Sequence, residues 1–153
     1  MYENLLAGVS TDLWIDGKWR AASHGERFDV EDPATGQTIA SVPSASVADC
    51  LAAVAAADRA MAGWGRKTPR ERGEILLKAY EIMMREGERL ARIVTLENGK
   101  SLADARAEIG YAAEFFRWNA EEAVRVIGQF STAPASGAPP RRPVAAPSPT
   151  PRR

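Results

Sequence analysis

The chain has 153 residues, 45% of them apolar, with 20 basic and 20 acidic side chains, one His and one Cys. This length allows one domain of ordinary size. A single Cys excludes an internal disulfide, and one Cys with one His excludes a structural zinc site with four nitrogen or sulfur ligands. The longest apolar run is far shorter than the roughly 18 residues of a membrane-spanning helix, and the N-terminus lacks the regions typical of a signal peptide. We therefore expect a cytoplasmic protein with no membrane partner.

Charge divides the chain near Phe130. Residues 1–130 carry 16 basic and 20 acidic groups, whereas residues 131–153 carry four Arg and no acid. The second segment also holds seven of the ten prolines and no aromatic residue, so it cannot bury enough apolar surface to order itself. The composition predicts a folded segment over residues 1–130 and a disordered Pro/Arg/Ala-rich tail over residues 131–153.

Short apolar segments near the N-terminus predict a small β-element. Two of them flank Asp16-Gly17, the kind of dipeptide that most strongly indicates a two-residue hairpin turn. The other two flank residues 32–36, where Pro fixes φ and Gly accepts a positive φ. The expected strands cover residues 13–15, 18–19, 28–30 and 38–42.

After Pro43 the apolar residues recur at helical spacing, so the fold class is mainly α with a small N-terminal β-element. Each expected helix has an N-cap residue, and an acidic residue stands three positions after each cap. Glu86-Gly87 interrupts the second helix, and Gly99 follows it as a left-handed C-cap. The expected helices start at the caps Ser46, Thr68 and Ser101 and end near residues 65, 98 and 128.

The last predicted helix carries two apolar surfaces. One is an aromatic ridge formed by Tyr111, Phe115 and Trp118 at positions i, i+4 and i+7. A helix with two apolar surfaces requires two neighbours, and the remaining elements supply one. We therefore expect an exposed face that favours self-association. The second surface is a stripe formed by Leu102, Ala105, Ile109, Ala112, Phe116, Ala120, Val124 and Ile127.

Three patterns resemble functional sites, and each has a simpler structural interpretation. Gly99-Lys100-Ser101 resembles the end of a phosphate-binding loop, but Val94 stands where that loop requires Gly. Cys50 lies in the first turn of a helix, where the helix dipole favours a thiolate. Its candidate base, His24, lies in an expected loop. We expect a helix junction at Gly99, a packing role for Cys50 and a solvated His24.

Paired carboxylates such as Glu86/Glu88 and Glu121/Glu122 are candidates for acid–base chemistry. They lie among Arg residues at helical spacing, as in Glu121 to Arg125, so we expect solvated ion pairs. The aromatic ridge has no basic stripe beside it and the body is acidic, which argues against a nucleic-acid partner. A PxxP match at residues 140–143 is expected by chance in so Pro-rich a tail.

Several motifs resemble, in order, the N-terminal segment of the aldehyde dehydrogenase superfamily. They are LWIDGKW, FDVEDPATGQTIASVPSAS, DCLAAVAAADRAMAGWGRKTPRERGEILLKAYEIM and LARIVTLENGKSLADARAEIGYAAEFFRWNAEEAVRVIG. TLENGKSLADARAEI together with FFRWNAEEA is most similar to the NAD(P)-dependent succinate-semialdehyde dehydrogenase branch. The resemblance covers about residues 13–128.

The resemblance implies an incomplete N-terminal part of the α/β aldehyde dehydrogenase fold. The family's nucleophilic Cys, general-base Glu, oxyanion-binding Asn and cofactor-binding residues have no counterpart here. We therefore assign no catalytic, cofactor-binding or metal residue, and expect no NAD or NADP bound by this chain alone. In the family, the last helix lies near the substrate entrance, which makes Tyr111, Phe115 and Trp118 candidate entrance-lining residues. We expect a coding sequence that ends early.

The expected function is that of a fragment of an NAD(P)-dependent aldehyde dehydrogenase. The family reaction combines thiolate attack on an aldehyde, hydride transfer to the cofactor and thioester hydrolysis, here with succinate semialdehyde as the implied substrate. We expect this chain to be inactive alone. The alternative is a non-catalytic binding or regulatory module that docks through its exposed helix face or its Pro-rich tail. Expected partners are another copy of the chain or a full-length enzyme.

Overall fold

The computed structural model describes the backbone of residues 3–126, with side chains from residue 5 onward. Helices dominate and four short strands lie near the N-terminus, which confirms the predicted fold class. The predicted tail at residues 131–153 lies outside the described residues. The elements are α1 Glu3–Leu6, β1 Leu13–Ile15, β2 Lys18–Arg20, β3 Arg27–Glu31, β4 Thr38–Pro43, α2 Val47–Arg66, α3 Pro69–Arg85, α4 Gly87–Asn98, α5 Leu102–Glu122 and the 3₁₀ helix η1 Ala123–Arg125.

The strands form two antiparallel pairs, β1 with β2 and β3 with β4. The predicted hairpin turn is confirmed, with φ of 55° at Asp16 and 76° at Gly17. Two consecutive positive φ angles match the twist of the flanking strands, which is why Asp-Gly is suited to this turn. Trp14 and Trp19 face each other across the pair, with their ring centroids 4.9 Å apart.

Asp49 joins the first hairpin to α2. Its side chain is 1% exposed and accepts hydrogen bonds from the backbone amide and hydroxyl of Ser46, which confirms the predicted N-cap and forms a capping box with it. The same carboxylate accepts from the amide and hydroxyl of Ser23 and from Arg20 Nη2 at 2.5 Å. These donors favour the charged form and hold the pKa of Asp49 well below its usual value. The N-cap is therefore also a tertiary contact.

Helices α3, α4 and α5 pack together, and small residues set their separation. Ala91 and Ala113 are completely buried. Gly73 on α3 lies so close to α5 that a Cβ added there would be 2.8 Å from the Ala120 carbonyl oxygen. Glu86 separates α3 from α4, so the predicted interruption is confirmed.

The end of the last helix was predicted too late. The α-helix ends at Glu122, and η1 follows before Val126 adopts an extended backbone, with ψ of 94°. Val124 and Val126 are β-branched and lower the helix propensity of this final stretch. The 3₁₀ geometry also fits the common tightening of a last helical turn. Gly128, which the sequence suggested as the stop, lies outside the described residues.

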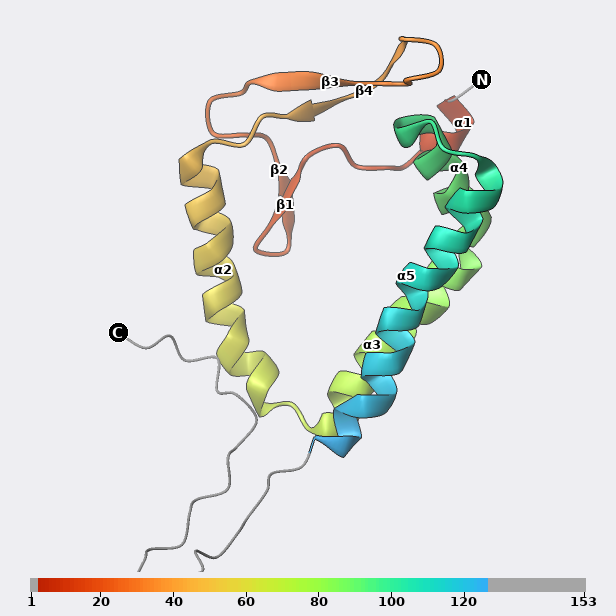
Figure 1. Cartoon of the computed structure of the whole chain (residues 1–153). Coiled ribbons are helices and arrows are strands. Elements are labelled where there is room, and N and C mark those ends of the chain that lie inside the picture. Colours follow the sequence, from red (N-terminus) through yellow and green to blue (C-terminus); the bar gives the residue numbers. More distant parts are fainter. Residues whose placement is uncertain (1–2, 127–153) are drawn as a thin grey trace, which may run out of the picture.

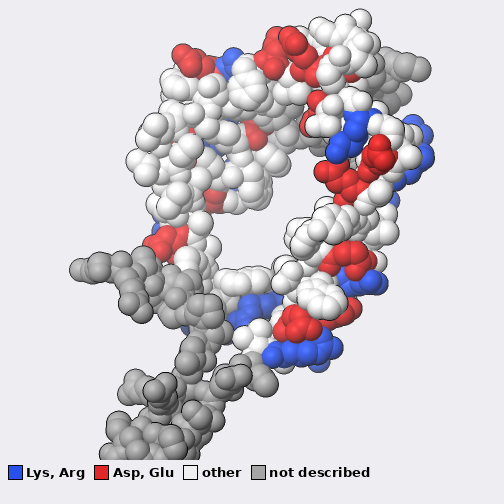
Figure 2. Space-filling model, in the orientation of Figure 1, with Lys and Arg blue, Asp and Glu red and all other residues white. Residues whose placement is uncertain are grey.

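The described residues form two arms joined at both ends (Figure 1). One arm contains α2 and the other contains α3, α4 and α5, while the strands and α1 connect them at the far end from the α2–α3 link. Arg89 on α4 holds α1 by donating to the carbonyl oxygens of Leu5 and Ala7, at 3.0 and 2.5 Å. Figure 2 shows an opening between the arms, and the visible face of the α2 arm is largely uncharged.

Candidate functional site

The aromatic ridge lies on the exposed side of α5. Tyr111, Phe115 and Trp118 are 69%, 55% and 66% exposed, and the rings of Tyr111 and Phe115 meet edge to face at 5.0 Å. Together with Glu114 they line a shallow pocket of about 240 Å³. The predicted exposure of one apolar surface is therefore confirmed among the described residues. Their assignment to a substrate entrance stays a prediction.

The opposite stripe of α5 is only partly covered. Ala105 and Ala120 are buried against the other helices, whereas Phe116 and Val124 remain exposed. Large side chains on this surface thus keep apolar area in contact with solvent even where the helices pack. Apolar area outside a core contributes little to stability, since the stabilisation scales with the area removed from water.

The junction between α4 and α5 orients the ridge. Gly99 ends α4 with φ of 76°, and the Ser101 hydroxyl accepts from the amide of Asp104 at 3.1 Å to begin α5. The prediction that Gly99-Lys100-Ser101 is a C-cap followed by an N-cap is confirmed. A phosphate-binding loop would instead follow a strand, and here a helix precedes it.

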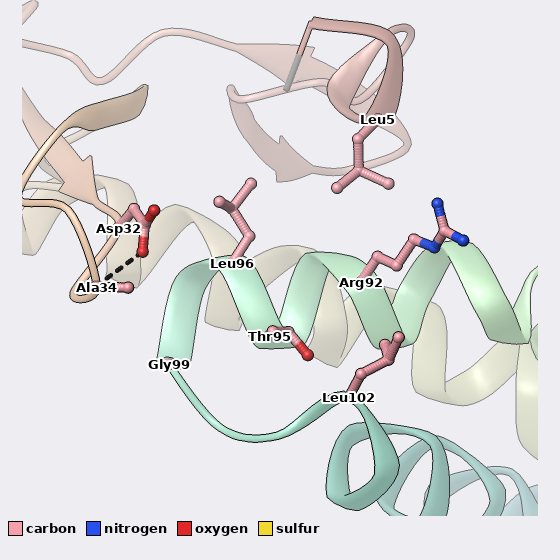
Figure 3. Close-up of a pocket in the computed structure, with 8 residues that line it drawn as sticks. All are labelled: Leu5, Asp32, Ala34, Arg92, Thr95, Leu96, Gly99 and Leu102. Carbon is pink, nitrogen blue, oxygen red and sulfur yellow. Dashed lines mark hydrogen bonds between the residues drawn. The ribbon is translucent and has the colours of Figure 1, made fainter. Parts of the chain in front are cut away.

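A second pocket, of about 350 Å³, lies where α4 meets the β3–β4 turn (Figure 3). Asp32 is buried there and accepts from the amide of Ala34 and the hydroxyl of Thr35, both at 2.9 Å. Thr95 Oγ1 is buried and makes no hydrogen bond with the described part of the chain. The lining residues are Leu5, Asp32, Ala34, Arg92, Thr95, Leu96, Gly99 and Leu102.

This second pocket was not predicted from the sequence. It depends on the close approach of Gly99 to the turn, where an added Cβ would be 2.9 Å from Pro33 Cγ. Gly99 and Pro33 are far apart in sequence, and no sequence pattern predicts that they are in contact. The sequence predicted the Gly99 C-cap and the Pro-containing turn separately, but not their contact. The pocket's lining residues include neither Cys nor His.

The packing role predicted for Cys50 is wrong, because Cys50 is exposed on α2. It lies beside the α2 face, which we define as Val47, Leu51 and Val54, with exposed fractions of 77%, 64% and 65%. The sequence correctly shows an apolar helix surface. Within residues 3–126, however, no element packs against that surface strongly enough to cover it.

His24 lies in the loop between β2 and β3 and is exposed, as predicted. Its Nδ1 accepts from the amide of Glu26 at 3.3 Å, and its Nε2 lies 3.9 Å from the Glu26 carboxylate. The imidazole is therefore directed to its own loop. These contacts do not place it as a base for Cys50.

Three of the four carboxylates form surface ion pairs, as expected: Glu86 with Arg85, Glu88 with Arg92 and Arg106, and Glu122 with Arg125. Glu88 accepts from Arg106 at 2.8 and 2.9 Å and from Arg92 at 3.1 Å, which joins α4 to α5. Hydrogen bonds from the two guanidinium groups lower the pKa of Glu88 to about 2. Such a carboxylate stays ionised at neutral pH and is unsuited to proton transfer there.

The predicted ion pair between Glu121 and Arg125 is wrong, because Arg125 has a different partner. Arg125 contacts Glu122 at 2.7 Å in place of Glu121. The reason is the tightening of the chain in η1, because residues three apart are superposed in a 3₁₀ helix whereas i,i+4 pairs need an α-helical turn.

Residues 3–126 hold no group of three or more His, Cys, Asp or Glu side chains placed to bind a metal ion. Nor does any helix in this range have the length and apolarity required to cross a membrane.

Comparison with known proteins gives a consistent result. Residues 19–145 match the aldehyde dehydrogenase family. The chain is 45% identical over 128 residues to 3-sulfolactaldehyde dehydrogenase of Pseudomonas putida, covering 84% of this chain and 26% of the relative. It is also 45% identical over 114 residues to succinate-semialdehyde dehydrogenase [NADP(+)] GabD of Escherichia coli K12, covering 74% of this chain and 24% of the relative.

A solved structure shows that the likeness extends to three dimensions. The crystal structure of succinate-semialdehyde dehydrogenase from Burkholderia pseudomallei superposes with a TM-score of 0.80 at 41% identity, over 83% of this chain and 26% of that one. The chain belongs to the aldehyde dehydrogenase family, and its similarity to the succinate-semialdehyde enzymes confirms the predicted resemblance. It spans about a quarter of the length of the curated relatives it matches.

Proposed function

We propose that this chain supplies the N-terminal part of an NAD(P)-dependent aldehyde dehydrogenase that oxidises succinate semialdehyde to the acid. The observation that carries the proposal is the 45% identity to the NADP(+)-named E. coli succinate-semialdehyde enzyme, together with the 0.80 TM-score to the Burkholderia structure. Both the E. coli and the Pseudomonas relatives are named for aldehydes that also carry an anionic group. A short aldehyde with a terminal carboxylate is thus the substrate class to test first.

We also propose that this chain is inactive alone. In this family the substrate is attacked by a thiolate, and a base then activates water to release the acid. The thiol of Cys50 lies on the exposed α2 face, while His24 is directed toward Glu26. These positions do not form a nucleophile–base pair.

The described residues do not fit a nicotinamide cofactor either. Binding of a dinucleotide pyrophosphate typically uses a Gly-rich turn between a strand and a helix N-terminus. The one Gly-Lys-Ser sequence here joins two helices, with Gly99 as the C-cap of α4. This junction therefore lacks the strand-to-helix geometry of a pyrophosphate-binding turn.

Two assays test the proposal. The full chain is incubated with succinate semialdehyde and NAD or NADP, and reduced cofactor is followed by absorbance, with Cys50→Ala as control. No turnover is expected, and turnover that requires Cys50 would overturn the inactivity. In the second assay, residues 1–126 replace the matched N-terminal quarter of the E. coli enzyme. A folded chimera that oxidises succinate semialdehyde supports the assignment, and a folded but inactive chimera contradicts it.

A further inference from the structure

The N-terminal segment forms one side of the second pocket. The side chain of Leu5 points from α1 toward α4 and lines the pocket together with Leu96 and Leu102 (Figure 3). Leu96 is only 6% exposed with the segment in place. The other sides are supplied by the β3–β4 turn, α4 and α5. Helix α1 therefore covers part of an apolar pocket that lies where the strands meet the helical arm.

Helix α1 is too short to be stable by itself. It has four residues, and forming a single helical turn is unfavourable because several backbone torsions are fixed for each hydrogen bond gained. Its end is closed by Gly8, with φ of 75°, and by the Val9 amide, which donates to the Leu6 carbonyl oxygen at 3.0 Å. The rest of its stability must come from contacts with other elements.

Arg89 on α4 supplies the polar part of those contacts. Its Nε and Nη2 donate to the carbonyl oxygens of Leu5 and Ala7, at 3.0 and 2.5 Å. A guanidinium presents its donors in a rigid planar fork, so one side-chain orientation makes both bonds. Arg85 on α3 instead pairs with the carboxylate of Glu86 at 3.0 Å. Arg89 thus differs from Arg85 in holding the backbone of a separate element.

A second arginine fixes the other end of the segment. Arg27 on β3 donates to the Asp12 carboxylate and to the Thr11 hydroxyl, both at 3.0 Å. Between the two arginine contacts, residues 7–10 are exposed. Local opening costs little free energy where few apolar groups are buried. The α1 end can therefore leave α4 while Thr11 and Asp12 stay attached to β3.

We propose that residues 3–7 form a strap that closes the second pocket, and that Arg89 is the latch of this strap. In the closed state Leu5 lies over the pocket and Arg89 holds the two carbonyl oxygens. In the released state the strap swings about residues 8–10, and the pocket wall at Leu96 becomes exposed to solvent. The strap is thus a unit of low stability on the more stable packing of α3, α4 and α5.

The first test measures amide hydrogen exchange of the full chain by mass spectrometry. Arg89→Gln removes the guanidinium fork, so exchange within residues 3–10 is expected to be about tenfold or more faster, with exchange in α3 and α5 unchanged. Arg85→Gln is the matched control, because Arg85 is exposed and contacts Glu86, and it is expected to leave residues 3–10 unchanged. Equal exchange in Arg89→Gln and the parent would overturn the latch. Faster exchange in α3 and α5 as well would overturn the strap as a separate unit.

The second test measures closure of the pocket itself. Leu96→Cys in a Cys50→Ala background places the one thiol of the chain in the pocket wall, and its alkylation is followed by mass spectrometry of its peptide. Adding Arg89→Gln is expected to speed this alkylation by about tenfold or more, whereas adding Arg85→Gln should not. A thiol that reacts equally fast in both backgrounds would show that the strap does not close the pocket.

A milder substitution serves if Arg89→Gln does not fold. Arg89→Lys keeps the positive charge but lacks the planar fork that reaches both carbonyl oxygens. It is expected to give exchange and alkylation rates between those of the parent and those expected for Arg89→Gln. Rates identical to the parent in both measurements would overturn the role of Arg89 as the latch.

Discussion

Two Gly→Ala variants, compared in stability, distinguish the effect of α3–α5 packing from the effect of helix propensity. Gly73 and Gly110 both lie inside α-helices, so replacing either by Ala gains about 1 kcal/mol of intrinsic helix propensity. At Gly110 an added Cβ meets no atom within 4 Å, whereas at Gly73 it would be 2.8 Å from the Ala120 carbonyl oxygen. The two substitutions therefore differ in the steric contact that the added methyl group makes with α5.

The magnitude follows from that contact. Ordinary van der Waals contact begins near 3.4 Å, so α3 and α5 must separate by about 0.6 Å to accept the new methyl group. The obstructing atom is backbone and cannot rotate away, and such overpacking costs about 1–3 kcal/mol. Because the propensity gain is common to both variants, Gly73→Ala is expected to be less stable than Gly110→Ala by about 1–3 kcal/mol.

Thermal unfolding followed by far-ultraviolet circular dichroism measures this difference. For a domain of this size each kcal/mol shifts Tm by roughly 4 °C. Gly110→Ala should melt above the parent chain and Gly73→Ala below Gly110→Ala by several degrees. Equal Tm values for the two variants would show that the α3–α5 contact is looser than described, and would refute the close approach at Gly73.

Three other changes test local features. Thr68→Ala removes the capping-box hydroxyl of α3 and is expected to cost about 1 kcal/mol in chemical denaturation, with no change if that helix end is frayed. Gly99→Ala forces a left-handed Ala and a contact 2.9 Å from Pro33 Cγ, so Tm should fall by several degrees, whereas an unchanged Tm would contradict the described turn. Asp49 has a lowered pKa, so its contribution to stability is present above the normal Asp pKa and is lost as the pH falls through the depressed value. Asp49→Asn should flatten the stability profile below pH of about 4, and a profile identical to that of the parent would contradict this.

Local features were predictable because their causes lie within a few residues. The Asp16-Gly17 turn follows from the positive φ that its two residues accept, and the helix starts at Ser46 and Thr68 follow from side-chain caps. The family resemblance was also readable, since several motifs occur in the right order. The end of α5 was less predictable. Gly128 suggested a C-terminal stop, but the helix ends earlier, next to the β-branched residues Val124 and Val126.

Burial could not be predicted in the same way. Cys50 lies on an apolar helix surface, and such a surface is normally packed, so the sequence suggested a buried thiol. Whether it is covered depends on which elements lie opposite, and helical periodicity carries no information about that. The pocket beside Gly99 was missed for a related reason, because it is formed by the approach of Pro33 from a distant turn.

The packing of α3, α4 and α5 has a consequence for synthesis on the ribosome. These helices are consecutive, so their mutual contacts join residues at short sequence separation and can form early, as is typical of helical proteins with low contact order. In a relative of which this region is about a quarter, translation at about 5–20 residues per second leaves a delay on the order of tens of seconds before the remainder is complete. Throughout that interval the helix that corresponds to α5 can form before the segments that follow it are complete, and in this chain that helix exposes Tyr111, Phe115 and Trp118 to solvent. Transiently exposed apolar surface of this kind makes folding intermediates prone to aggregation.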